Sequence, residues 1–351
     1  MGETIMKRIA FHNREKETKE IMDILDDEPS LITFVYGPIN SGKTTTISHL
    51  IKELPEDYAP FYVNLRGRFV TDYEDFLNVL FEIDEEEGGG NVAEYAKSAL
   101  KDLGTVSGIP IPINLFERIF EKKDKSKDMF RYIERFFAEI SKTRTPILII
   151  DELQVIGDLK IDGLLIYKLF NFFIRLTKET HLAQVFVVTS DSLFLENVYS
   201  EAMLDGRCRY LLVDDFDHET TSAFLDKYGF TDDDIAMAWE SCGGKPVCLV
   251  ELVNTKLGSG DITEKTDKML EEEISRLVFL LARNKETKSD IIDMLTIFAS
   301  VEEVKYSDSM EIDLLSFLVK QNILFLDSAR RTIKPQSRLN LLAIREVIAD
   351  A

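Results

Sequence analysis

The chain alternates short, continuously apolar runs with segments in which apolar residues recur at helical spacing. Continuous apolar runs of about four to eight residues are typical of strands buried on both faces of a sheet. Strands that alternate with helices predict parallel crossover units, and therefore an α/β fold with helices on both faces of a parallel sheet. The expected strands are residues 31–37, 60–66, 146–152, 183–190 and 209–216.

The order of these patterns divides the chain into three predicted domains. Residues 1–216 hold the expected strands and form the core, which contains a mostly helical insertion at about 71–140 with a small β hairpin at 106–116. This insertion fits either a binding site for a partner or a brace against the core. Residues 217–283 are helical in pattern and predict a lid. Residues 284–351 predict a winged-helix-like domain, with helices at 287–299, 309–321 and 337–348 and a hairpin at 323–335.

A glycine-containing loop directly follows the first expected strand and directly precedes a helix. Its spacing, G-x-x-x-x-G-K-[ST], is the pattern of a phosphate-binding loop. The glycines let the backbone curl so that successive N–H groups point at anionic oxygens, and the following helix adds the positive end of its dipole. The predicted nucleotide-binding residues are Gly37, Pro38, Ile39, Asn40, Ser41, Gly42, Lys43 and Thr44, with Thr45 next in the helix.

Two side chains of this motif have specific expected roles. Lys43 would reach the β- and γ-phosphates, and the hydroxyl of Thr44 would complete the shell of a Mg²⁺ ion. The segment 287–290 has the pattern T-K-x-D of a guanine-binding motif, but it lies in a helical stretch with no buried strand before it. The sequence therefore predicts ATP, rather than GTP, together with Mg²⁺.

Acidic residues end the third expected strand. Asp151 and Glu152 would emerge at the carboxyl end of that strand, the edge at which parallel sheets bind ligands. Asp151 can hold Mg²⁺ through water, while Glu152 can orient and deprotonate an attacking water. A glutamate in this place favours hydrolysis over phosphoryl transfer to a small acceptor, so the sequence predicts an ATPase.

The fourth expected strand ends in two hydroxyl residues, Thr189 and Ser190. Either one could contact the γ-phosphate or the attacking water, and Ser190 is the candidate that we assign to catalysis. The open alternative is that Ser190, Asp191 or Ser192 caps the next helix, because serine and aspartate are favoured at that position.

Composition limits the partners and the compartment. The chain has 63 acidic and 42 basic residues, a formal net charge of −21, which repels polyphosphate and argues against broad non-specific binding of nucleic acid. Cys208, Cys242 and Cys248 have neither zinc-site nor disulfide-framework spacing, which favours a reducing cytoplasm. No apolar run approaches the roughly 18 residues of a membrane span, so we expect a cytoplasmic protein with no membrane contact.

Several segments together are similar to one protein family. Over nearly its whole length the chain resembles the archaeal P-loop ATPases, which are related to the STAND and AAA superfamilies. The Asn-Arg-Glu start, the Gly-Arg pair and the later Gly-Gly-x-Pro are more specific than the phosphate-binding loop alone. The segments concerned are FHNREKE (11–17), GPINSGKTT (37–45), LIIDELQ (148–154), VVTSDS (187–192), DGRCRYLLVDDFDHET (205–220) and CGGKPVCLVEL (242–252).

The resemblance implies a RecA-like or AAA-like core and further site residues. Asn13 and Arg14 would pack near the adenine, and Pro246 would lie near the base at the start of a lid helix. Arg207 would approach the γ-phosphate, either within its own chain or across to a neighbour. The resemblance also implies a switch in which ATP or ADP determines the angle between core and lid.

The C-terminal domain leaves the partner of this switch open. Its predicted recognition helix offers mostly acidic and apolar side chains, which suits protein better than the base edges of DNA. A basic wing could nevertheless hold DNA phosphates. We expect an ATPase switch that acts on a protein partner; the alternatives are a DNA-associated ATPase and a nucleotide-binding module with little hydrolysis. The basic residues are Arg330, Arg331, Lys334, Arg338 and Arg345, with no acidic residue in 328–345.

Overall fold

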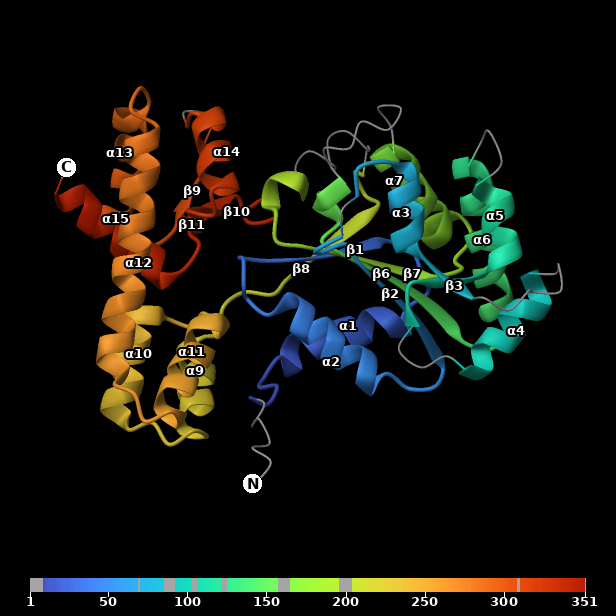
Figure 1. Ribbon diagram of the computed structural model, residues 1–351, viewed down its shortest axis with the longest axis horizontal. Coiled ribbons are helices and arrows are strands. Elements are labelled where there is room, and N and C mark those ends of the chain that lie inside the picture. Colours follow the sequence, from blue (N-terminus) through green and yellow to red (C-terminus); the bar gives the residue numbers. More distant parts are fainter. Residues whose placement is uncertain are drawn as a thin grey trace.

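A parallel sheet of six strands lies at the centre of the core (Figure 1). The computed structural model describes residues 9–68, 70–84, 92–102, 106–120, 125–156, 165–195, 204–307 and 310–350. The strand order is β4-β2-β6-β7-β1-β8, which confirms the predicted α/β class. The strands are β1 (Ile32–Tyr36), β2 (Tyr58–Asn64), β4 (Val106–Ser107), β6 (Thr145–Asp151), β7 (Gln184–Thr189) and β8 (Cys208–Leu212).

Both faces of the sheet are covered by helices, as the continuous apolar runs require. All five residues of β1 are buried. Phe34 faces Phe170 with ring centres 5.8 Å apart, whereas Val35 belongs to a cluster on the other face that includes Ile21 and Ile47. The helices named by these contacts are α1 (Glu15–Asp26) and α2 (Lys43–Glu53) on one face and α7 (Leu165–Ile174) on the other; α7 continues as a π-helical turn, Arg175–Glu179.

The insertion between β2 and β6 is mostly helical, but the hairpin predicted at 106–116 is wrong. β4 pairs in parallel with β2, and β5 pairs in parallel with β3, so β4 and β5 are not partners. Gly108 separates them with a φ of 119°, and the chain turns away from the central sheet there. The described elements are α3 (Tyr73–Leu80), β3 (Phe81–Asp84), α4 (Val92–Asp102), β5 (Ile109–Pro112), α5 (Ile113–Phe120) and α6 (Lys125–Ile140).

The helical segment after β8 is followed by the C-terminal elements in the predicted order. α12 connects the two, because its second half places Leu277, Leu280 and Leu281 in the same apolar cluster as Ile291 and Leu318. The domain boundaries at 216 and 283 stay predictions. The elements are α9 (His218–Asp226), α10 (Asp232–Cys242), α11 (Pro246–Leu257), α12 (Ile262–Arg283), α13 (Lys288–Thr296), η3 (Ile297–Ala299), β9 (Val304–Lys305), α14 (Ile312–Lys320), β10 (Leu324–Asp327), β11 (Thr332–Pro335) and α15 (Arg338–Ala349).

The β10–β11 hairpin packs against the carboxyl end of β1. The rings of Tyr36 and Phe325 stack with centres 6.4 Å apart, and the Tyr36 hydroxyl donates to Asp327 Oδ1 at 2.9 Å. Phe325 belongs to the main apolar cluster of the core. The hairpin therefore brings the C-terminal domain to the edge of the sheet from which the loop after β1 emerges. Of the helices in the described ranges, none is long and apolar enough to cross a membrane.

The basic side chains of residues 328–345 all have intramolecular contacts. Lys334, for example, is ion-paired with Asp214 of the core at 2.6 Å. Phosphate would have to displace the partners of Lys334, Arg338 and Arg345, whereas Arg330 and Arg331 are exposed. The other contacts are Arg330 with Asp327, Arg331 over the ring of Tyr306, Arg338 with Glu240 and Glu302, and Arg345 with the carbonyl oxygen of Phe298.

Candidate functional site

The loop between β1 and α2 curls against the linker that follows β8. A Cβ atom on Gly37 would lie 2.1 Å from the carbonyl oxygen of Val213, so only glycine allows this close approach. Ser41 contacts the same oxygen, because its hydroxyl donates to it at 2.6 Å. Gly42 is the N-cap of α2 with a φ of 95°, in the left-handed region that favours glycine. The glycine spacing thus reflects a close approach at one end of the loop and a left-handed turn at the other.

Lys43 begins α2 and folds back over the loop. Its Nζ donates to the carbonyl oxygens of Gly37 at 3.0 Å and Pro38 at 2.8 Å. An ammonium group has three N–H donors, so one remains for a ligand. Burial, together with the neighbouring Lys245, lowers the pKa of Lys43 to about 8, although nearby carboxylates oppose the shift. A buried cation next to a curled loop of amides suits an anionic ligand.

Asp151 ends β6 beside the first turn of α2. Its Oδ2 accepts hydrogen bonds from the hydroxyls of Thr44 and Tyr62, each at 2.8 Å. Its Oδ1 is buried without a hydrogen-bond partner, and burial raises the pKa of the carboxyl. Mg²⁺ prefers hard oxygen ligands and commonly takes only one or two from the protein, with water and phosphate supplying the rest. The unpartnered carboxylate oxygen and the Thr44 hydroxyl therefore fit a Mg²⁺ ion.

Glu152 follows Asp151, and its backbone N–H and both carboxylate oxygens are hydrogen-bonded. Its φ of 62° is unusual for a residue with a side chain, and its N–H donates to Val188 of β7 at 2.9 Å. Its Oε1 accepts a hydrogen bond from Arg66, which follows β2. Its Oε2 accepts from Gln154 at 2.5 Å, and Gln154 in turn accepts from the Thr189 hydroxyl at 2.7 Å. The ends of three neighbouring strands thus orient this carboxylate.

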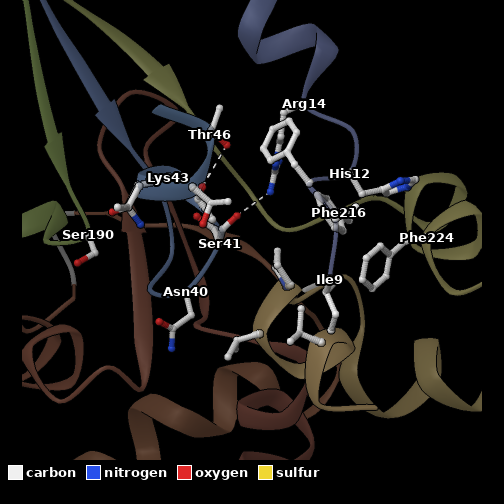
Figure 2. A pocket seen from close by; sticks show the side chains of 18 of the residues that line it. Ile9, His12, Arg14, Asn40, Ser41, Lys43, Thr46, Ser190, Phe216 and Phe224 are labelled. Atoms are coloured by element: carbon white, nitrogen blue, oxygen red, sulfur yellow. Dashed lines mark hydrogen bonds between the residues drawn. The ribbon is translucent and has the colours of Figure 1, made fainter. Parts of the chain in front are cut away.

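Two roles are considered for the residues at the end of β7, namely contact with the nucleotide and capping of the next helix. Ser190 lines the same cavity as Lys43 (Figure 2). Glu152 also lines this cavity. Asp191 makes the helix-capping contacts, because its Oδ1 accepts from the N–H groups of Leu193 at 2.9 Å and Phe194 at 3.1 Å. The capping alternative therefore applies to Asp191, and Ser190 keeps its place on the cavity wall.

The loop opens into a cavity of about 420 Å³ that is polar at one end and apolar at the other (Figure 2). A pocket of this size and mixed lining is typical of small-molecule and cofactor sites. Gly37, Pro38 and Ile39 are not among the lining residues that the structure describes. The polar end is lined by Asn40, Ser41, Gly42, Lys43, Thr44, Thr45, Arg66, Glu152 and Ser190, and the apolar end by Ile9, Phe11, Phe216, Phe224, Pro246, Val247 and Val250.

Arg14 ties the segment before α1 to the loop. Its guanidinium donates to the carbonyl oxygens of Ser41 at 2.6 Å and Asp214 at 2.7 Å, and it lies 4.6 Å from the centre of the Phe216 ring. Arg14 lines the cavity. Asn13 instead donates to the Thr220 hydroxyl of α9 at 2.7 Å. The structure therefore places Arg14 at the cavity and uses Asn13 to anchor the segment to the lid.

The lid reaches the loop through the first residues of α11. Pro246 is the first residue of that helix and lines the apolar end of the cavity. The preceding Lys245 points at the loop, where its Nζ donates to the carbonyl oxygen of Ile39 at 3.0 Å and pairs with Asp215 at 2.9 Å. The Gly-Gly-Lys-Pro turn thus contacts both the cavity and the outside of the loop.

Arg207 lies next to the amino-terminal ends of β1 and β8, whereas the phosphate loop lies at their carboxyl-terminal ends. Its carbonyl oxygen accepts from the N–H of Ile32, the first residue of β1, whereas the loop follows Tyr36 at the other end. The five residues of β1 span about 16 Å, further than an arginine side chain reaches. The expectation that Arg207 contacts the γ-phosphate within its own chain is therefore wrong, because the parallel register of β1 and β8 places Arg207 at the amino ends. A contact with the nucleotide of a neighbouring chain stays a prediction.

Sequence reasoning missed several side chains of the site: the polar ones are Tyr62, Arg66, Gln154 and Lys245, and the aromatic ones at the apolar end are Phe11, Phe216 and Phe224. Arg66 is the last residue of the expected strand 60–66, and that position is a signal that could have found it, since the carboxyl ends of parallel strands share one edge. For Tyr62, in the middle of that strand, and for Gln154 and Lys245, only the folded chain shows the contact.

Comparisons with known proteins agree with this geometry. Residues 11–252 match a family described as ATPase domains predominantly from Archaea, and residues 263–348 match the C-terminal domain of MJ1010-like ATP-binding proteins. An ATP-binding protein of Pyrococcus abyssi is 46% identical over 340 residues, covering 96% of this chain and 98% of the relative. One of Methanocaldococcus jannaschii is 45% identical over 357 residues, covering 97% and 98%. The solved structure of a Walker-type ATPase of Pyrococcus abyssi shares the fold, with a TM-score of 0.65 at 18% identity over 96% of this chain and 97% of that one.

Proposed function

The chain belongs to the family of ATPases found predominantly in Archaea and is an ATP-binding protein, and from this premise we propose that it hydrolyses ATP with Mg²⁺ and acts as a nucleotide-driven switch. One observation carries the proposal: the loop, Lys43 and Glu152 line a single cavity. A phosphate-binding end, an apolar end for the base and a carboxylate beside the phosphates are the parts that ATP hydrolysis needs.

The cavity accommodates ATP in one orientation. The triphosphate lies in the polar end, where the amides of the loop, the remaining donor of Lys43 and the dipole of α2 favour negative charge. The base lies in the apolar end, against Phe216 and Pro246. The Thr44 hydroxyl and, through water, the Asp151 carboxylate would hold a Mg²⁺ ion, which would supply positive charge next to the phosphates.

Hydrolysis then requires one proton transfer and one displacement. Glu152 accepts a proton from a water molecule, whose oxygen forms a bond to the γ-phosphorus while the bond to the oxygen bridging to the β-phosphate breaks. ADP and inorganic phosphate are the products. Arg66 and Gln154 hold the Glu152 carboxylate in position, and the Ser190 hydroxyl contacts the γ-phosphate or the attacking water. The charge that develops in the transition state is thus stabilised by side chains that are already positioned before the reaction. Such preorganisation is usually the largest contribution to catalysis.

The substitution Glu152→Gln tests this mechanism. An amide cannot accept the proton, so we expect kcat to fall about 10²–10³-fold while ATP still binds. The measurements are phosphate release with and without EDTA, and ATP affinity by calorimetry. EDTA is expected to abolish turnover, because the metal neutralises the transferring phosphate.

A matched control is Glu179→Gln, which makes the same chemical change on an exposed side chain at the end of the π-helical turn. It should leave kcat unchanged. Full turnover by Glu152→Gln would contradict the role of Glu152 as the general base. Turnover that EDTA does not affect would contradict the proposed requirement for Mg²⁺. If the wild-type chain binds ATP but does not hydrolyse it, the result would support the alternative of a nucleotide-binding module with little hydrolysis.

The switch is proposed to act through a protein partner. The lid and the C-terminal domain both contact the phosphate loop. A change in the conformation of the loop on nucleotide binding would therefore affect both domains. Lys334, Arg338 and Arg345 hold partners within the chain, and the net charge of −21 disfavours DNA. The winged-helix interpretation of the C-terminal domain and a cytoplasmic location belong to the same proposal.

A further inference from the structure

Ile39 lies in the middle of the phosphate loop, and both of its backbone polar groups are bound by side chains from elsewhere in the fold. Its N–H donates to Gln336 Oε1 at 3.1 Å. Its carbonyl oxygen accepts from Lys245 Nζ at 3.0 Å. Ile39 is not among the described residues that line the cavity, so both contacts approach the loop from its outer side.

Both partners are buried and fixed by bonds of their own. Gln336 is 3% exposed, and its Nε2 donates to the carbonyl oxygen of Leu324 at 3.0 Å. Lys245 is also 3% exposed and pairs with Asp215 at 2.9 Å. A side chain held at a second point has little freedom to follow a moving loop. The peptide groups of Ile39 are therefore confined to one orientation while these contacts persist.

The two side chains come from different domains. Lys245 is the N-cap residue of α11 in the lid, and Gln336 directly follows β11 in the C-terminal domain. The same hairpin carries Lys334, which pairs with Asp214, and the carbonyl oxygen of Asp214 accepts from Arg14. Arg14 also binds Ser41 of the loop. The loop is thus connected to the C-terminal domain by two separate routes.

We propose that Gln336 and Lys245 are positioning residues for the phosphate loop, which hold the Ile39 peptide so that the neighbouring amides are set for phosphate before the nucleotide arrives. This inference rests on ATP binding in the cavity. Because the contacts join domains, the coupling is reciprocal: docking of the C-terminal domain strengthens nucleotide binding, and bound nucleotide strengthens docking by the same free energy. Neither side chain touches the nucleotide.

The test compares Gln336→Leu with Gln321→Leu in the full chain. Gln321 lies in the same domain with an exposed side chain, so the second variant makes the same chemical change away from the loop. We expect Gln336→Leu to raise the Kd for Mg²⁺·ADP and the KM for ATP about threefold to tenfold, the effect of one hydrogen bond, with kcat changed less than twofold. Gln321→Leu should match the wild type.

A second readout separates positioning from general destabilisation. Hydrogen exchange in the β10–β11 hairpin should slow on adding Mg²⁺·ADP to the wild type and to Gln321→Leu, and should slow less in Gln336→Leu, where only the route through Lys334, Asp214 and Arg14 remains. If Gln336→Leu fails to fold, the paired variant Lys245→Met with Asp215→Asn removes the other contact without leaving a buried charge unpaired, and it should raise Kd in the same way.

The outcomes distinguish this inference from the proposed function. A wild-type chain that binds no nucleotide defeats the function. A wild-type chain that binds nucleotide, with Gln336→Leu and the paired variant both within twofold of it in Kd, overturns the positioning role alone.

Discussion

Lys43 carries the positive charge expected for phosphate binding, but its side chain is buried. Burial disfavours a charged ammonium group when no anionic ligand is present. Two carbonyl oxygens compensate part of the lost hydration, yet burial and Lys245 still lower its pKa to about 8. An anion placed beside the ammonium favours the charged form, so the pKa of Lys43 rises when nucleotide binds. Binding is therefore coupled to protonation.

This coupling predicts how nucleotide affinity depends on pH. Below a pH of about 8 the lysine is already charged and Kd should be constant. Above it, the free protein must take up a proton in order to bind, so Kd should rise by up to about tenfold per pH unit. Calorimetry of Mg²⁺·ADP binding between pH 7 and 9.5, in two buffers of different ionisation enthalpy, measures both the affinity and the proton uptake.

Lys43→Arg provides the comparison, because a guanidinium stays charged over this range. Its affinity is expected to be lower but independent of pH. A wild-type Kd that stays constant from pH 7.5 to 9.5, without proton uptake, would contradict the coupling.

At the scale of elements, the turn between α10 and α11 determines where the lid meets the core. A Cβ atom on Gly244 would lie 1.7 Å from the carbonyl oxygen of Phe216, while the Phe216 N–H donates to Gly244 at 2.8 Å. The turn and the linker after β8 are therefore in backbone-to-backbone contact. This contact places Pro246 at the cavity and Lys245 at the loop.

Gly244→Ala should consequently push the lid away from the core. We expect the free energy of unfolding to fall by about 3 kcal/mol, since the clash is with backbone that cannot rotate aside, and nucleotide affinity to fall with it. Urea unfolding and ADP binding measure the two effects.

Gly229→Ala is the control for the loss of a glycine. Gly229 has a φ of 75° and no atom within 4 Å of an added Cβ, so the alanine meets backbone strain alone, about 1–2 kcal/mol. Nucleotide affinity should stay unchanged in this variant. Equal effects of the two substitutions would exclude the close contact at Gly244.

At the scale of the whole molecule, the two edges of the sheet have different surroundings. The carboxyl edge holds the loop, the acidic pair and the contacts of the lid and the C-terminal domain. The amino edge holds Arg207, whose backbone is bonded to Leu204 and Ile32. An arginine at that edge can serve a nucleotide only in another copy of the chain.

Mixing two variants, each expected to have little turnover alone, tests this arrangement. Arg207→Ala keeps the base but lacks the arginine, and Glu152→Gln keeps the arginine but lacks the base. If the arginine acts across chains, the mixture should recover part of the turnover, and wild-type turnover should rise more than linearly with protein concentration. Wild-type turnover by Arg207→Ala alone, with turnover strictly linear in protein concentration, would exclude a role for Arg207 in catalysis.

Features that depend on neighbouring residues could be predicted from the amino-acid order. Continuous apolar runs located β1, β6 and β7, because a strand buried on both faces tolerates few polar side chains, and they also located β2 and β8, which are only partly buried. The glycine spacing of residues 37–42 located the loop, because backbone curling is a local property. The order of strands and helices then indicated that Lys43 and Glu152 share one edge of the sheet.

Contacts between residues far apart in the chain could not be predicted in this way. Ile39 and Gln336 are separated by 297 positions, and no local pattern marks one as the partner of the other. The pairing of β4 with β2 rather than β5 likewise depends on which edge is open, and the place of Arg207 depends on strand register. Such contacts arise from packing of the whole chain, since each is chosen by competition among many possible partners once the core has formed.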